Sequence, residues 1–140
     1  MGYIQHKSEE SVEDYLETIL VLSKQLPVVR SIDIANELEY SKPSVSVAMK
    51  NLRENGYIRM DEQGHITLTE TGQSIADVMY ERHILLSNWL IYLGVDPQTA
   101  AEDACRMEHV ISPESFEAIK KHITQGNELP KELKEESIHA

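Results

Sequence analysis

The periodicity of the apolar residues changes at Gly56, and this change constrains the fold more than any other feature. Before Gly56, apolar residues recur at i, i+3, i+4 and i+7, the spacing of one buried helix face. After it, Tyr57–Met60 and His65–Leu68 show a period of two, and the polar residues Asp61–Gly64 separate them. This predicts two short strands joined as a β-hairpin. Short helices followed by such a hairpin indicate a winged helix-turn-helix, with the hairpin as the wing.

Caps and helix breakers divide the segment before Gly56 into three predicted helices. The first begins at Ser11 and is closed by Pro27, and the second is Ile32–Glu39 with Ser31 as its N-cap. Tyr40–Pro43 forms a tight turn, because proline disfavours helical geometry in the preceding residue and suits a first helical turn. The third helix then runs to about Asn55. Its predicted buried face consists of Val45, Ala48, Met49 and Leu52.

A second group of helices is predicted after the hairpin. A long helix starts at Thr69 or Thr71 and stops at Gly94, and Asp96–Pro97 and Ser112–Pro113 each open a further helix as N-cap and first position. We expect a mainly α protein with three parts: a winged helix-turn-helix (1–72), a helical domain (73–125) and a polar tail (126–140).

The composition excludes several classes of protein. The chain has 140 residues, a single cysteine, Cys105, and no run of about 18 apolar residues. A disulfide-rich secreted scaffold and a multi-cysteine zinc module are therefore excluded. The first seven residues also lack the apolar stretch of a signal peptide. We expect a cytoplasmic protein with no membrane partner.

The net charge of −11 argues against a polyanionic partner, but the charges are unevenly distributed. Between Lys42 and Arg59 cations outnumber acids, whereas acids concentrate around 9–17, 102–108 and 132–136. A basic surface for a nucleic acid can therefore coexist with acidic clusters that attract a divalent cation.

The outward face of the third helix is suited to the major groove of double-stranded DNA, which is about 12 Å wide. We expect serines and Lys50 to meet base edges or phosphates, arginines to meet phosphates, and Pro43 and Val47 to contact thymine methyl groups. The predicted DNA-binding residues are Lys42, Pro43, Ser44, Ser46, Val47, Lys50, Arg53 and Arg59. The wing tip is acidic and offers only His65 to a phosphate. The alternative is a winged helix used only for protein contacts, which the basic surplus disfavours.

Three potential metal ligands lie together on one predicted helix. Cys105, Glu108 and His109 occupy i, i+3 and i+4, so a thiolate, a carboxylate and an imidazole share a face, a set suited to Fe(II), Zn(II), Co(II) or Ni(II). Asp14 and Glu17 offer two oxygens from the first helix, and His83 offers a nitrogen from the long helix. Each has a structural alternative: Asp14 in a capping box with Ser11, Cys105 as a small buried hydrophobe, His83 as a core histidine.

Taken together, these motifs resemble the DtxR/MntR family of metal-dependent repressors, over nearly the whole chain from Ser11 to about Ile123. The segments that carry the resemblance are Glu13–Glu17, Lys42–Ser46, Arg82–His83 with Leu85–Leu86, and above all Cys105–Ser112. The resemblance implies a homodimer in which residues 73–125 form the dimerisation and metal-binding domain. It implies that the metal ligands are Asp14, Glu17, His83, Cys105, Glu108 and His109. The chain is too short for the SH3-like third domain of the longer members, so it is similar to the short architecture.

The ligand set departs from both branches of the family. The manganese branch has a carboxylate at the position of Cys105, and the iron branch has a cysteine there. Conversely, the manganese branch has an acid at the positions of both Asp14 and Glu17, and the iron branch has an acid at neither. Ser87 and Ala101 replace the partner glutamate and a histidine of the iron branch's ancillary site. Because a thiolate disfavours hard Mn(II), we expect Fe(II), with Mn(II) the close alternative and Zn(II), Co(II) or Ni(II) able to substitute, at one or two ions per subunit.

The resemblance therefore implies a metal-activated transcriptional repressor of metal-ion homeostasis that binds a pseudo-palindromic operator. One alternative is a winged-helix regulator that senses an organic ligand and ignores metal. A metal-dependent hydrolase built on His83, Glu108 and His109 is the other, but no glycine-rich oxyanion or phosphate loop accompanies these residues. We therefore expect no enzymatic activity.

Overall fold

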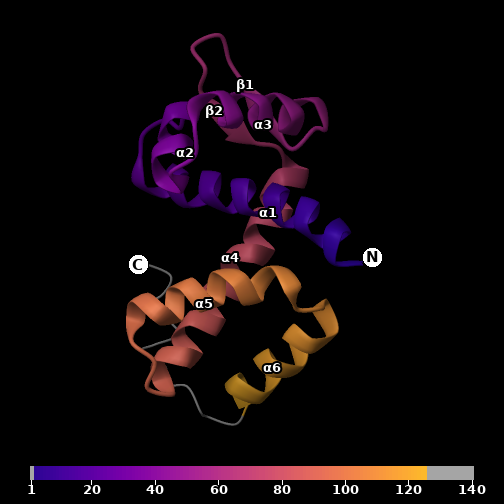
Figure 1. Ribbon diagram of the computed structural model, residues 1–140, viewed down its shortest axis with the longest axis vertical. Coiled ribbons are helices and arrows are strands. Elements are labelled where there is room, and N and C mark those ends of the chain that lie inside the picture. The colour runs from indigo at the N-terminus through magenta and orange to yellow at the C-terminus, as the bar shows by residue number, and fades with distance from the viewer. Residues whose placement is uncertain (1, 126–140) are drawn as a thin grey trace. The chain divides into compact units, whose positions relative to one another are not determined.

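The computed structural model describes residues 2–125, with side chains from Ser11 onward, and shows a mainly α-helical protein with one hairpin (Figure 1). In chain order the elements are α1 (Gly2–Gln25), α2 (Ser31–Leu38), α3 (Lys42–Glu54), β1 (Ile58–Met60), β2 (Ile66–Leu68), α4 (Glu70–Tyr92), α5 (Pro97–Val110) and α6 (Pro113–Gln125). None of the described helices combines the length and the apolar character that crossing a bilayer requires. The predicted polar tail, 126–140, lies outside the described residues.

The chain divides into two compact units, Met1–Val78 and Met79–Ala140. The boundary falls within α4, so this helix belongs to both units.

The first unit is built around α3, whose predicted buried face is confirmed. Val45 and Met49 are fully buried and Leu52 is 3% exposed, while Ala48 is half-buried. Ser41 is the N-cap of α3, and its side chain accepts a hydrogen bond from the backbone N–H of Ser44 (3.3 Å). The other apolar residues buried in this core include Leu16, Ile19, Ile34, Ile58 and Ile66.

Two predicted helix starts are wrong. The first helix begins at Gly2 rather than at Ser11. The N-cap of α2 is Arg30 rather than Ser31, because the backbone N–H of Arg30 donates to the Asp33 carboxylate (2.8 Å) and thereby satisfies the helix entry. The turn between α2 and α3 contains Glu39 at φ 58°, in the left-handed region, where its backbone N–H closes α2 on the Ala35 carbonyl.

The predicted hairpin is confirmed, with β1 and β2 antiparallel and Ile58 opposite Leu68. The N–H of Ile66 donates to the carbonyl of Val29 (2.8 Å), so the hairpin is also attached to the segment before α2. At its base the chain passes close to α4. A Cβ built on Gly72 would lie 2.1 Å from the carbonyl oxygen of Tyr57, so only glycine fits there.

The second unit packs the later part of α4 with α5 and α6. Its core centres on Leu86, Ala104 and Phe116. The predicted caps are confirmed. Asp96 accepts hydrogen bonds from the N–H groups of Gln98 and Thr99, and the Ser112 hydroxyl accepts one from the N–H of Ser115.

Candidate metal centre and nucleic-acid interface

Four of the predicted ligands come together within the second unit. His83 lies on α4, and Cys105, Glu108 and His109 lie on one face of the last two turns of α5. Nδ1 of His83 is 3.2 Å from Oε2 of Glu108, and Nε2 of His109 is 3.6 Å from Oε1 of the same carboxylate. The thiol of Cys105 and a ring nitrogen of His109 lie within 4.8 Å of each other. Glu108 is fully buried, and its two carboxylate oxygens lie near the two histidines, so the carboxylate is at the centre of this group.

These distances fit a transition-metal ion. Metal–ligand bonds of about 2.0 to 2.2 Å place neighbouring donor atoms about 3 to 3.5 Å apart. The buried Nδ1 of His83 makes no hydrogen bond within the described part of the chain, although the Glu108 carboxylate is close to it. A ring nitrogen and a carboxylate oxygen at this spacing can both coordinate one cation. Imidazole, carboxylate and thiolate together are the donor set of borderline divalent ions.

Arg82 holds the end of α5 that carries these donors. Its Nη1 donates to the carbonyl oxygens of Glu108 (2.9 Å) and Ile111 (3.0 Å), and its guanidinium carbon lies 5.3 Å from the centre of the Phe116 ring. The side chain is 7% exposed. A cation at the C-terminus of a helix satisfies its last carbonyls and complements its dipole. Arg82 is adjacent to His83 in α4, so its hydrogen bonds hold the turn of α5 that contains Glu108 close to His83.

The remaining predicted ligands, Asp14 and Glu17, lie one turn apart on α1, in the first unit. Glu17 is 8% exposed and Asp14 is half-buried.

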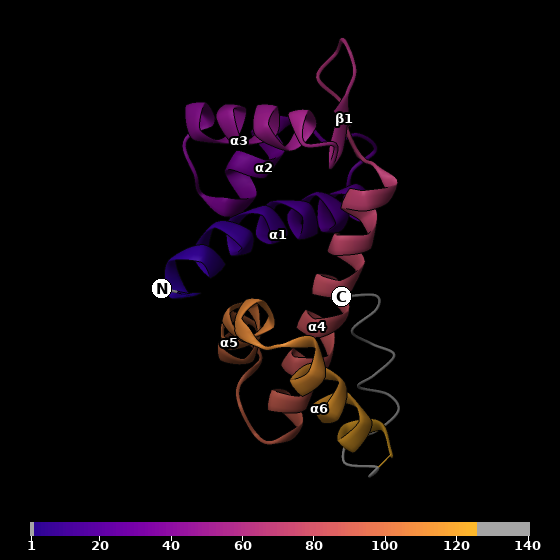
Figure 2. The ribbon, with the colours of Figure 1, turned by 90° about the vertical axis from the view of Figure 1, so that its right-hand side faces the viewer.

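The predicted DNA-contacting residues all lie on solvent-exposed surface of the first unit. On α3 the exposed positions include Val47, at 61%, with Lys50 and Arg53. On β1, Arg59 is exposed opposite Thr67. The buried and exposed faces of α3 are therefore those predicted. In two views the wing loop rises from the side of the first unit on which α3 lies (Figure 1, Figure 2).

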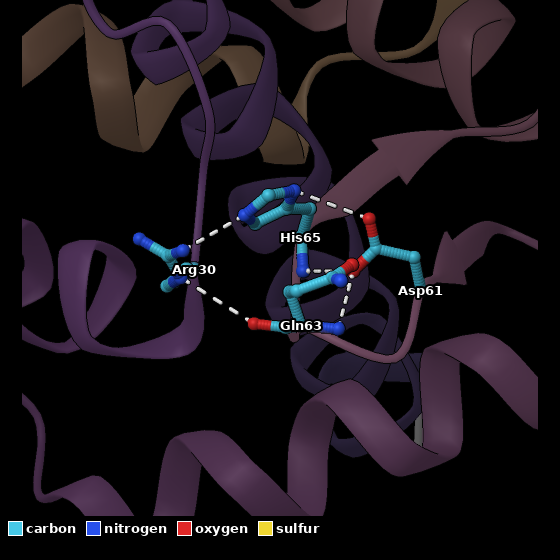
Figure 3. Close-up of polar contacts among 4 residues, drawn as sticks. All are labelled: Arg30, Asp61, Gln63 and His65. Carbon is cyan, nitrogen blue, oxygen red and sulfur yellow. Dashed lines mark hydrogen bonds and ion pairs between the residues drawn. The ribbon is translucent and has the colours of Figure 1, made fainter.

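Sequence reasoning missed two arginines. Arg82 belongs to a segment that carries the family resemblance, but its capping of α5 depends on carbonyls that only folding brings near it. Arg30 lies against the wing tip, where its guanidinium contacts His65 and Gln63 (Figure 3). The prediction that the wing tip offers only His65 to a phosphate overlooked this arginine.

Family models match both parts of the chain. Residues 1–66 match the N-terminal DNA-binding domain of iron-dependent repressors, and residues 69–135 match the metal-binding and dimerisation domain of the same family.

Individual proteins agree with the family models. The transcriptional regulator MntR of Escherichia coli O6:H1 is 36% identical over 111 residues, which are 79% of this chain and 72% of that protein. An uncharacterized helix-turn-helix regulator of Methanocaldococcus jannaschii is 34% identical over 79% of this chain and 90% of its own.

Among solved structures, the manganese regulator SloR superposes with a TM-score of 0.72 and 30% identity over 81% of this chain and 53% of its own. A manganese-dependent transcriptional repressor in complex with manganese superposes with a TM-score of 0.74 and 26% identity over 81% of this chain and 52% of its own. This chain thus spans about half the length of these solved proteins.

Proposed function

The chain belongs to the iron-dependent repressor family, a family of transcriptional regulators. We propose that it is a homodimeric repressor whose binding to DNA is activated by a divalent transition-metal ion. The observation that carries the proposal is the set of donor atoms around Glu108. They stand at metal-ligand spacing in a chain that also presents an exposed basic helix, α3.

The proposed ligands are Asp14, Glu17, His83, Cys105, Glu108 and His109. Support for the last four comes from their proximity in the second unit. Asp14 and Glu17 add two hard oxygen donors, and their spacing of one helical turn allows both to approach one ion or two neighbouring ions.

The ion we propose is Fe(II), with Mn(II) as the close alternative. Cys105 favours the softer Fe(II), since thiolates bind Mn(II) weakly. The two acids favour Mn(II), and several relatives are named as manganese regulators. Zn(II), Co(II) and Ni(II) suit the same donors.

The switch follows from electrostatics. Two carboxylates about 4 Å apart repel each other by roughly 4 kcal/mol at an effective dielectric constant near 20, and a cation reverses the sign of that interaction. Because the proposed ligands come from α1 and from α4 and α5, an ion bound by all of them would join the winged helix to the dimerisation unit. In the dimer this would set the separation of the two α3 helices, which must match half-sites about 34 Å apart in a pseudo-palindromic operator.

The test is fluorescence anisotropy of a labelled duplex under anaerobic conditions, with Fe(II), Mn(II), Zn(II) or EDTA in parallel. The duplex is one selected from a random pool by the metal-loaded protein. We expect metal to raise DNA affinity by about 5- to 150-fold, the usual range of allosteric coupling. Glu108→Gln should abolish the increase, and Glu102→Gln, an exposed acid on the same helix, should retain it.

Tight metal binding that left DNA affinity unchanged would contradict the switch. DNA affinity that is high and insensitive to EDTA would favour a regulator of another effector class.

A further inference from the structure

The loop of the wing is held in one conformation by Asp61. Its Oδ1 accepts hydrogen bonds from the backbone N–H groups of Gln63 and His65, both at 2.9 Å, and its Oδ2 lies 3.1 Å from Nδ1 of His65 (Figure 3). The backbone N–H of His65 is the main reason why the pKa of Asp61 is held below its ordinary value. Asp61 therefore stays ionised, and its charge is directed into the loop.

Arg30 joins this loop from the segment before α2. Its Nε donates to the carbonyl oxygen of Gln63 (3.4 Å), and its Nη2 lies 2.8 Å from Nε2 of His65. Since arginine has only donors, a hydrogen bond here uses Nε2 of His65 as the acceptor and leaves Nδ1 to face Asp61. Both ring nitrogens of His65 are thus used within the chain Arg30, His65, Asp61.

This arrangement leaves Arg30 with capacity for another acceptor. A guanidinium has five N–H donors, and the wing takes one from Nε and one from Nη2. The side chain is exposed, and its other terminal nitrogen is turned away from both wing partners (Figure 3). Both Asp61 and His65 are engaged internally, so at the wing tip it is Arg30 that presents an outward positive charge, in addition to Arg59 on β1.

We propose that Arg30 binds phosphate at the wing tip: it holds the loop 61–65 and directs its remaining N–H groups to a backbone phosphate of duplex DNA. The proposal rests on the DNA binding proposed above. The acidic wing tip repels a polyanion unless a cation offsets its charge, and a planar guanidinium can bind the Gln63 carbonyl and a phosphate at once. The wing and α3 lie on the same side of the unit, so one duplex can contact both (Figure 2).

The test measures DNA affinity of the Mn(II)-loaded protein by anisotropy between about 50 and 200 mM salt, on a pool-selected duplex and on a shuffled one. Four variants separate the possible roles. Arg30→Gln removes the positive charge, and Arg30→Lys keeps the charge but loses the planar guanidinium. His65→Phe removes the contacts of the His65 ring with Arg30 and Asp61, while Arg30 stays charged. Lys121→Gln, an exposed lysine on α6, is the control for loss of one charge. Thermal melting by circular dichroism verifies that each variant is folded.

For Arg30→Gln we expect DNA affinity to fall about tenfold on both duplexes. The slope of log affinity against log salt concentration, here called the salt slope, should become shallower by about 0.9 for each phosphate that is no longer neutralised. Arg30→Lys should keep most of the slope but lose part of the affinity. His65→Phe should lower affinity with the slope unchanged.

The proposal is overturned if Arg30→Gln behaves like Lys121→Gln, or if its affinity falls with no change of slope, since Arg30 would then only brace the wing. The proposed function fails separately, if EDTA leaves the affinity of the wild-type protein and of Lys121→Gln unchanged.

Discussion

The guanidinium of Arg82 donates to the carbonyl oxygen of Glu108 at 2.9 Å, so a buried cation on α4 fixes the turn of α5 that carries the candidate ligands. Hydrogen bonds from a charged donor to buried carbonyls contribute more than neutral ones, and leaving such acceptors unsatisfied is costly. This interaction connects the stability of the second unit to the geometry of its donor atoms.

Replacing Arg82 should therefore affect both stability and metal binding. We expect Arg82→Met to lower the free energy of unfolding by about 3 kcal/mol, because the carbonyls of Glu108 and Ile111 are left without their donor. The affinity for Mn(II) should fall about tenfold, and Arg82→Lys should recover part of both losses. Urea unfolding of the metal-free protein and metal titration measure the two effects.

The control is the exposed Lys120–Glu81 pair, which links α6 to α4. Lys120→Met should lower the free energy of unfolding by less than about 1 kcal/mol. Equal costs for Arg82→Met and Lys120→Met would contradict this role of Arg82.

Gly72→Ala should destabilise the winged-helix unit. The added Cβ would lie 2.1 Å from the carbonyl oxygen of Tyr57, so α4 or the start of the hairpin must move. Strain of this kind costs about 1 to 3 kcal/mol, and because the obstacle is backbone we expect the upper end. Thermal unfolding compared with Ser74→Ala, an exposed position on the same helix, measures it. A melting temperature for Gly72→Ala equal to that of Ser74→Ala would show that the backbone yields easily.

Asp96 makes the stability of α5 depend on pH in the acid range. Hydrogen bonds from the side chain and backbone of Thr99 hold the pKa of Asp96 below its ordinary value of 3.8. The stabilisation of α5 by the ionised Asp96 is therefore complete above that value, and it is lost as the pH falls from about 4 through the lower pKa of the folded state. Asp96→Asn should cap α5 nearly as well at neutral pH and should flatten this acid dependence. Urea midpoints between pH 3 and 7 test it, and an acid limb as steep as that of the wild-type protein would show that other carboxyls dominate.

Cys105→Glu should change the preferred metal. Replacing a soft thiolate by a hard carboxylate favours Mn(II) relative to Fe(II) and Zn(II). Anaerobic competition titrations of the variant and the wild-type protein give the ranking, with Cys105→Ser as a control that removes the thiolate without adding a charge. If the order of affinities is the same in all three proteins, the thiol is not a ligand.

The parts of the fold set by local sequence were predictable. The buried face of α3 follows from the spacing of Val45, Met49 and Leu52, and Asp96–Pro97 marks the start of α5 because the cap and its acceptors are neighbours. The start of α2 was not predictable in this way. Ser31 has the residue type of an N-cap, but the N–H of Arg30 and the carboxylate of Asp33 satisfy the helix entry instead.

The candidate site shows the same division. Glu108 and His109 are recognisable because helix geometry places near neighbours on one face. Arg82 reaches the Glu108 carbonyl across 26 residues, and Arg30 reaches His65 across 35, and neither separation has a periodicity that a sequence reveals. Interactions of this range depend on tertiary packing, which is why the contacts of both arginines emerged only from the structure.

The left-handed backbone of Glu39 offers a route to a more heat-resistant protein. A residue with a Cβ loses roughly 1 to 2 kcal/mol in this conformation, a penalty that glycine escapes. Glu39→Gly should therefore remove this backbone penalty and stabilise the turn between α2 and α3, without altering the proposed metal ligands or the exposed face of α3. A protein engineer would begin at this position.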